Sequence, residues 1–141
     1  MASSTSSDYL FAAEMNYLLK GIAYTSPANI YVALFTTTPG LNGSGGSEVS
    51  TSGSGYTRVA VPTNTGWTGP NASLEWSNTN DIVFGTPTSS WGTIVSCGLY
   101  DALTGGNLLS VSPMTVSKVV SSGDGAPRIL AGQLVIKRAS C

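Results

Sequence analysis

Histidine is absent from this 141-residue sequence, and only 9% of its residues carry a charged side chain. The side chain that most often transfers protons near neutral pH is therefore missing. Acid, base or metal chemistry would have to come from the 7 Asp and Glu residues and the 2 cysteines. We therefore expect a structural or binding protein that is not an enzyme and that holds no metal and no cofactor.

Clusters of one charge sign are also missing. The formal net charge is -1, and the basic residues are scattered except for the adjacent pair Lys137 and Arg138. Nucleic acids and anionic membrane surfaces bind proteins through clustered Lys and Arg. We therefore expect neither nucleic acid nor a membrane as a partner. Lys137 and Arg138 remain candidates for contact with an acidic neighbouring protein.

Long hydrophobic runs do not occur. The longest uninterrupted one is Ile30–Phe35, which is far shorter than the roughly 20 residues that a membrane-spanning helix needs. The first residues also lack the basic stretch that precedes the apolar core of a signal peptide. We expect synthesis in the cytoplasm, where a disulfide between Cys97 and Cys141 has weak support. The favoured interpretation is a buried Cys97 and a free Cys141.

The best helix candidate lies in the N-terminal segment, residues 1–26. Ser7 can cap a helix, Asp8 suits its first turn, and Gly21 can end it. Leu10, Phe11, Tyr17 and Leu18 follow the spacing of one helical face. We expect this face to dock either on the sheet of its own chain or on a neighbouring subunit.

The remainder, residues 27–141, has the sequence pattern of a β domain. Short β-rich runs alternate with Gly, Pro, Asn, Ser and Thr clusters, which predicts a mainly β fold, a β-sandwich or barrel of about six to eight short antiparallel strands. Ile30–Phe35 is apolar on both alternating faces and should be a central strand covered on both sides. The predicted strands are Ile30–Thr36, Tyr56–Val61, Asp81–Phe84, Thr93–Asp101, Asn107–Val111, Thr115–Val120, Pro127–Leu130 and Gln133–Lys137.

Three connections stand out by composition. Residues 37–55 are rich in Gly and Ser, which predicts a long flexible loop that could become ordered in an assembly. Residues 100–109 carry Gly105 and Gly106 and predict a hairpin. Residues 121–127 predict a second turn of similar chemistry.

The chain offers few chemical motifs. Asp81 and Asp101 could act as acid and base only if the fold joined them in a cleft, and strand-end or turn carboxylates are far commoner. Trp67 and Trp76 flank a loop rich in Pro, Gly and Asn. A sugar-stacking or receptor-binding patch there is one interpretation, and aromatic packing at the ends of a sandwich or at a subunit interface is the favoured one.

An ordered series of segments along the chain forms a specific pattern. The segments are Tyr17–Pro39, Glu48–Ser50, Gly55–Val59, Asn78–Phe84, Trp91–Ile94, Gly98–Leu109 and Ala131–Leu134. This series resembles a family of small virion proteins of tailed phages. Members are often described as tail-fibre-like, and similar small β-proteins serve as head decoration or cement proteins. The resemblance covers most of the chain and implies a virion component made in the cytoplasm of a bacterial host.

Two hypotheses follow from the resemblance and the composition together. The leading one is a capsid cement or decoration protein on the capsid exterior, which bridges major capsid protein subunits as a homotrimer. The second is a tail or baseplate component that contacts tail proteins and binds a host polysaccharide. The predicted partner-binding residues are Leu10, Phe11, Tyr17, Trp67, Trp76, Lys137 and Arg138.

Overall fold

A computed structural model describes residues 4–137 of the chain. Its helix, α1, spans Asp8–Lys20 and begins and ends where the sequence predicts. Ser7 caps it, since its hydroxyl accepts a hydrogen bond from the Leu10 N–H at 3.1 Å. Gly21 ends it in the left-handed region, at φ 66°, and its N–H donates to the last helical carbonyls.

Eleven strands make up the rest of the described secondary structure, so the fold is mainly β, as predicted. They are β1 (Thr5–Ser6), β2 (Asn29–Thr37), β3 (Ser47–Glu48), β4 (Val59–Pro62), β5 (Trp67–Thr68), β6 (Glu75–Asn78), β7 (Ile82–Val83), β8 (Gly92–Tyr100), β9 (Leu108–Val120), β10 (Arg128–Ile129) and β11 (Val135–Lys137).

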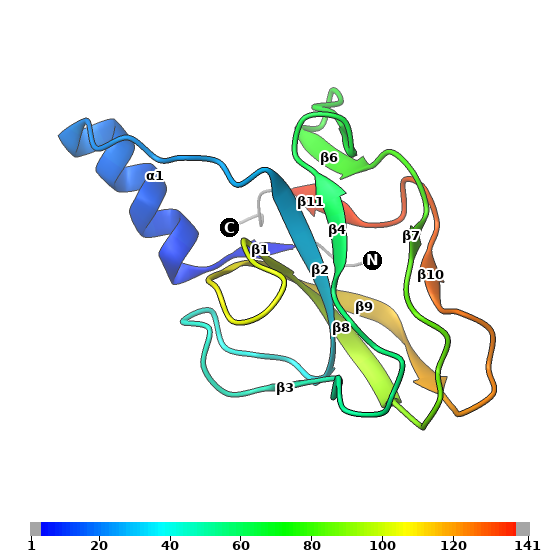
Figure 1. The fold of residues 1–141 in the computed structure, drawn as a ribbon. Helices are drawn as coiled ribbons and strands as arrows, with labels where there is room; N and C mark the ends of the chain where they lie inside the picture. Colours follow the sequence, from blue (N-terminus) through cyan, green and yellow to red (C-terminus); the bar gives the residue numbers. More distant parts are fainter. Residues whose placement is uncertain (1–3, 138–141) are drawn as a thin grey trace.

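The strands form three antiparallel sheets (Figure 1). The largest has six strands in the order β1-β9-β8-β2-β3, and β4 also pairs with β2. A three-stranded sheet, β11-β6-β5, and a two-stranded one, β10-β7, complete the set. Among the residues that the structure describes, the sheets remain open and do not close into a barrel.

β2 is the central strand that its sequence predicts. It pairs with β8 along one edge and with β4 and β3 along the other. Val32 and Leu34 point into one buried cluster, whereas Ala33 and Phe35 belong to a second cluster. Because neighbouring side chains of a strand point to opposite faces, these two clusters cover opposite faces of the sheet.

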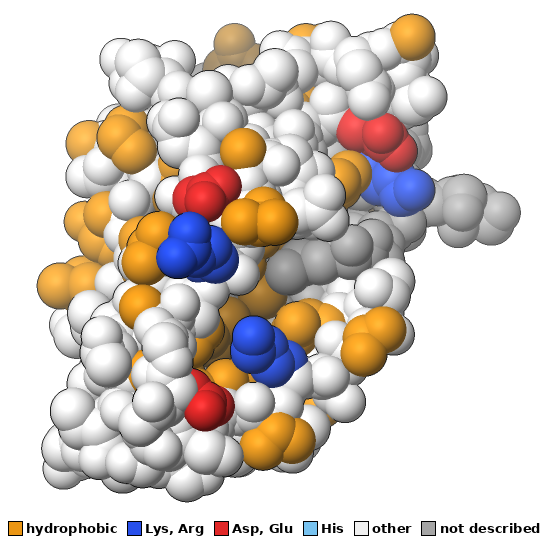
Figure 2. Space-filling model, turned by 90° about the vertical axis from the view of Figure 1, so that its right-hand side faces the viewer, with side chains coloured by type: hydrophobic (Ala, Val, Ile, Leu, Met, Phe, Trp, Pro, Cys, Tyr) orange, Lys and Arg blue, Asp and Glu red, His pale blue; other side chains and the backbone are white. Residues whose placement is uncertain are grey.

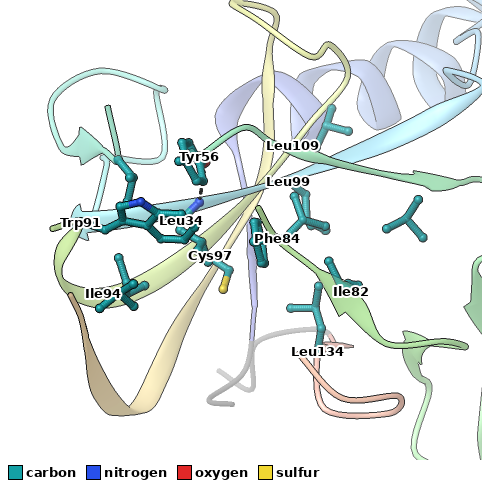
Figure 3. Close-up of a cluster of buried hydrophobic side chains, with 14 residues drawn as sticks. Leu34, Tyr56, Ile82, Phe84, Trp91, Ile94, Cys97, Leu99, Leu109 and Leu134 are labelled. Atoms are coloured by element: carbon teal, nitrogen blue, oxygen red, sulfur yellow. Dashed lines mark hydrogen bonds between the residues drawn. The ribbon is translucent and has the colours of Figure 1, made fainter. Parts of the chain in front are cut away.

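The main core lies between the six-stranded sheet and the segments that carry β7, β10 and β11 (Figure 3). Leu34, Cys97 and Leu99 contribute from β2 and β8, and Ile82 and Leu134 contribute from the opposite layer. The Tyr56 hydroxyl accepts a hydrogen bond from the Leu34 N–H at 2.9 Å, drawn as a dashed line. Cys97 is buried, as predicted, and Cys141 lies outside the described residues.

The predicted strand list differs from the structure in several places. It omits β1, β3, β5 and β6, and it divides into Asn107–Val111 and Thr115–Val120 what the structure shows as the single strand β9. The register against β8 shifts here, since Ile94 pairs with Lys118 and Ser96 with Pro113. On the edge of β9 that faces β1, pairing is limited to Val111 and Ser110. Pro113 lies beyond these pairs, so its lack of an N–H breaks no hydrogen bond with β1.

The glycine-rich segment 37–55 contains β3 and several defined contacts. Val49 and Ser54 are buried, and the Ser54 carbonyl accepts a 2.8 Å hydrogen bond from the Trp91 indole. Gly55 has φ 77°, and a Cβ there would lie 2.1 Å from the Thr86 carbonyl oxygen. Part of the glycine content therefore serves close packing of backbone against backbone. The flexibility of this segment stays a prediction.

A charged pair joins that segment to the β8–β9 hairpin. Arg58 donates from Nε and Nη2 to the two carboxylate oxygens of Glu48, at 2.9 and 2.8 Å. Its Nη1 donates to the carbonyls of Ala102 and Gly105, both at 2.9 Å. Its guanidinium also stacks on Tyr100, 3.7 Å from the ring centroid. Burial disfavours the charged form of Arg58, but Glu48 outweighs this effect and the pKa is raised.

Candidate binding surface

Helix α1 is attached to the β domain at its N-terminal end. β1 pairs with β9, and the next residue, Ser7, continues this attachment because its N–H donates to the Leu109 carbonyl at 2.9 Å. The Ser7 hydroxyl also donates to the Leu108 carbonyl. From this point the helix extends away from the sheets, as Figure 1 shows in blue. Its start is therefore fixed, whereas none of its residues is buried.

The exposed side chains of α1 are largely apolar and lie on more than one side of the helix. Phe11 and Tyr17 are each 59% exposed, and Leu18 and Leu19 are 69% and 78% exposed. A helix that is hydrophobic all round is typical of a buried position. Within residues 4–137 nothing buries α1, so it presents an exposed, largely apolar surface.

Beside the base of α1 lies an apolar groove of about 350 Å³. Its walls come from segments far apart in sequence, and most of its lining is apolar. We use the name apolar groove for the space lined chiefly by Leu10, Tyr24, Ile30, Trp67, Trp76 and Ile136. Trp67, Ile30, Leu10 and Ile136 also pack on the main core, so the floor of the groove is continuous with that core.

Trp67 contributes a polar feature to this groove. Its indole Nε1 is buried and lacks a hydrogen-bond partner among the described residues. Buried indole N–H groups usually find an acceptor, because an unpaired buried donor costs about 1–3 kcal/mol. The nitrogen is shielded from solvent, so an occupant of the groove does not reach it without a shift of the neighbouring side chains.

The other side of Trp76 belongs to a more polar pocket of about 470 Å³. This pocket also includes Asn71 and Glu75. The Asn71 amide donates to the Glu75 carboxylate at 3.0 Å, and Lys137 lies 3.5 Å from the same carboxylate group. The hydrogen bond from Asn71, aided by Lys137, holds the pKa of Glu75 below its ordinary value. The pocket therefore combines an exposed indole, an ionised carboxylate and an amide.

The structure brings together some of the predicted binding residues. Leu10, Trp67 and Trp76 meet in the apolar groove. Phe11 and Tyr17 lie on the exposed helix. Lys137 pairs with Glu75 of its own chain, and Arg138 lies outside the described residues.

Sequence reasoning missed three groove residues. Tyr24 lies in the linker between α1 and β2, Ile30 lies in β2, and Ile136 lies in β11. Ile30 and Ile136 were recognisable as strand residues, but their alternation does not reveal which strand ends meet α1. Only the tertiary arrangement joins these positions.

Asp81 and Asp101, which the sequence offered as a possible acid–base pair, accept hydrogen bonds in two different turns. Asp81 accepts a hydrogen bond from the Ala131 N–H at 2.8 Å and lies 3.8 Å from Arg128. Asp101 accepts from both the backbone and the side chain of Asn107, at 2.6 and 2.9 Å. Within residues 4–137, no group of three or more His, Cys, Asp or Glu side chains has a metal-binding arrangement.

The surface agrees with the sparse charge of the sequence. Figure 2 shows Lys and Arg side chains standing apart from one another on one face, with hydrophobic side chains between them. The helix of the described part is too short and too polar to cross a bilayer.

Comparison with known proteins gave one family. The model of the family described as podophage GP4 fiber I protein gp80 matches residues 5–137. No curated protein matches the chain.

Proposed function

The chain belongs to the family of the podophage GP4 fiber I protein gp80, and from this membership we propose that it is a structural subunit of a virion fibre. The coarser part of this statement, a structural role in a tailed-phage virion, follows from the family itself. The proposal adds the position in the particle and the way in which the subunit attaches.

The observation that carries the proposal is the exposed apolar helix α1. Its start is held by β1 and Ser7, whereas Phe11, Leu18 and Leu19 face outward. Exposed apolar patches of this kind usually mark surfaces that other proteins cover. We propose that α1 is the attachment element, which leaves much of the β domain at the surface of the fibre.

The fibre proposal also gives the Trp76 pocket a role. An indole face, a carboxylate and an amide are groups that stack on sugar rings and bind their hydroxyls. Trp76 is 40% exposed, and Asn71 and Glu75 lie in the same pocket. In this proposal the pocket contacts a polysaccharide of the host surface.

Labelling of intact particles tests the position. A gold-labelled antibody against the protein, with a count of copies per virion, should give signal confined to the tail or its fibres. A signal spread over the whole head would contradict the fibre proposal. For the pocket, Trp76→Ala should reduce retention on host polysaccharide, whereas Leu74→Ala, which removes an exposed side chain from the loop before β6, should not.

The second candidate is a capsid cement or decoration protein bound to the major capsid protein. The observation that favours it is the scarcity of surface charge together with α1, since weakly charged surface is cheaper to desolvate. If it is correct, particles without the protein should lose resistance to heat and shear. Unchanged resistance, or signal restricted to the tail, would remove this candidate.

In both candidates the protein is not an enzyme and binds neither nucleic acid nor membrane. Asp81→Asn and Asp101→Asn should then leave any host-glycan hydrolysis by virions unchanged. A loss of hydrolysis in either variant, with the fold intact, would contradict this part of the proposal.

A further inference from the structure

We infer that α1 of one chain docks in the apolar groove of a second copy of the same chain. The inference deepens the proposed function by naming the first partner of α1, and it rests on that proposal only in requiring an assembly. It joins two features of one molecule: an apolar helix and an apolar groove, neither of which is covered by another part of residues 4–137.

The area available on α1 is suited to a contact between subunits. Four of its large side chains are more than half exposed, namely Phe11, Tyr17, Leu18 and Leu19. At roughly 150–250 Å² for a large aromatic side chain, and less for leucine, they expose on the order of 500 Å². A standard protein interface buries about 800 Å² per partner. Phe11 and Leu18, which are seven residues apart and share one face, supply part of this area, and the groove of the same chain adds to the contact.

The dimensions of the groove decide how the helix would lie. A volume of about 350 Å³ is at the lower end of the range of sites that enclose a small ligand. It therefore admits a few large side chains but not a whole helix. The docked α1 would lie across the opening and insert side chains from one of its faces.

Helix α1 and the apolar groove form one continuous apolar surface. Leu10 belongs to both α1 and the groove. Tyr17 lies two turns further along the same side of the helix, because residues seven apart share a helical face. It therefore extends the wall of the groove outward along α1. A docked helix would contact the groove and the side of its neighbour's α1 at once.

Cross-linking between two variants that each carry one exposed cysteine tests the contact. Both carry Cys141→Ser, and Cys97 remains as a thiol that burial shields. One variant carries Leu18→Cys on α1, and the other carries Ser26→Cys at the groove. On mild oxidation of the mixture, we expect a disulfide-linked pair that contains one chain of each kind.

Val116 provides a matched control. It is 76% exposed, comparable with Leu18, but it lies on β9. A mixture of Val116→Cys and Ser26→Cys should give no linked pair above background. Linkage with Val116 as efficient as with Leu18, or linkage of α1 only to α1, would overturn the inference.

A second measurement needs no cysteine. Sedimentation of the purified full chain should show self-association, and Leu18→Glu should weaken it about tenfold or more, equivalent to at least 1.4 kcal/mol. Val116→Glu, which adds the same charge away from the groove, should leave it unchanged. A wild-type chain that stays monomeric at its highest soluble concentration would overturn the inference.

These tests use purified protein, and those of the proposed function use virions. The two results are therefore independent. Loss of the helix–groove contact with labelling still confined to the tail would reject only the inference. Intact self-association with labelling over the head would reject only the fibre position.

Discussion

Replacement of Arg58 by methionine should destabilise the protein strongly. Methionine keeps much of the apolar stem but removes the guanidinium, and with it two bonds to Glu48 and one to each of the carbonyls of Ala102 and Gly105. The stacking contact with Tyr100 is also lost. The Arg58 side chain is only 7% exposed, so water replaces these bonds poorly.

The expected magnitude follows from the burial of the pair. Removal of one partner of a buried ion pair costs about 3–5 kcal/mol, because it leaves the other charge unpaired. Glu48 is 25% exposed, so water reaches its carboxylate in part and we expect the lower end of this range, about 3 kcal/mol. At roughly 3 °C per kcal/mol for a domain of this length, Tm should fall by about 10 °C.

Urea unfolding followed by tryptophan fluorescence would measure this loss. The control is Arg128→Met, which removes an exposed pair with Asp81 at 3.8 Å and should cost less than about 1 kcal/mol. A double-mutant cycle with Glu48→Gln would separate the pair from the carbonyl bonds. If Arg58→Met cost no more than Arg128→Met, the assignment of Arg58 as the residue that joins the two segments would be refuted.

Three further predictions concern other contacts. Gly55→Ala should cost at least about 2 kcal/mol more than Gly53→Ala in urea unfolding, because both have positive φ but only Gly55 meets a backbone oxygen. Tyr56→Phe should cost about 1–3 kcal/mol in the same assay, since it leaves the Leu34 N–H unpaired. Burial raises the pKa of Cys97 to about 12, so iodoacetamide should alkylate it very slowly in the native Cys141→Ser protein at pH 8 and readily in urea.

The Cys97 shift also fixes the sign of a pH effect. The unfolded thiol loses its proton near its ordinary pKa of 9.0, whereas the folded one keeps it to about 12. The stability that the protonated Cys97 thiol gives to the folded state is therefore fully present below pH 9. It decreases as the pH rises from there toward 12. A Cys97→Ala variant should lose less stability over that interval than the parent. Equal losses, or rapid alkylation of the native thiol, would contradict the burial of Cys97.

Local signals in the sequence predicted the helix and the central strand well. Ser7, Gly21 and the run Ile30–Phe35 act through contacts with near neighbours or through simple alternation, so their effect can be recognised without the fold. Composition was less informative for residues 37–55. There the requirement for Gly55 comes from Thr86, which only the tertiary fold brings close.

The candidate binding surface was predicted only in part for the same reason. Leu10, Trp67 and Trp76 were identified singly, from helical spacing and from the cost of exposing an indole to water. Their meeting with Ile136 depends on the pairing of β11 with β6, which no local pattern encodes. The proposed partner contact of Lys137 and Arg138 stays a prediction, and the structure adds that Lys137 lies 3.5 Å from Glu75 on the adjacent strand.

The way in which α1 is inserted between β1 and β2 determines how the subunit would carry mechanical load. A pull on the helix reaches the β domain along two routes that differ in strength. β1 holds β9 at two residue pairs, whereas β2 is paired with β8, β4 and β3. Under tension the short ladder should therefore peel first, and the chain would lengthen by the released segment while the central strand kept the domain in place.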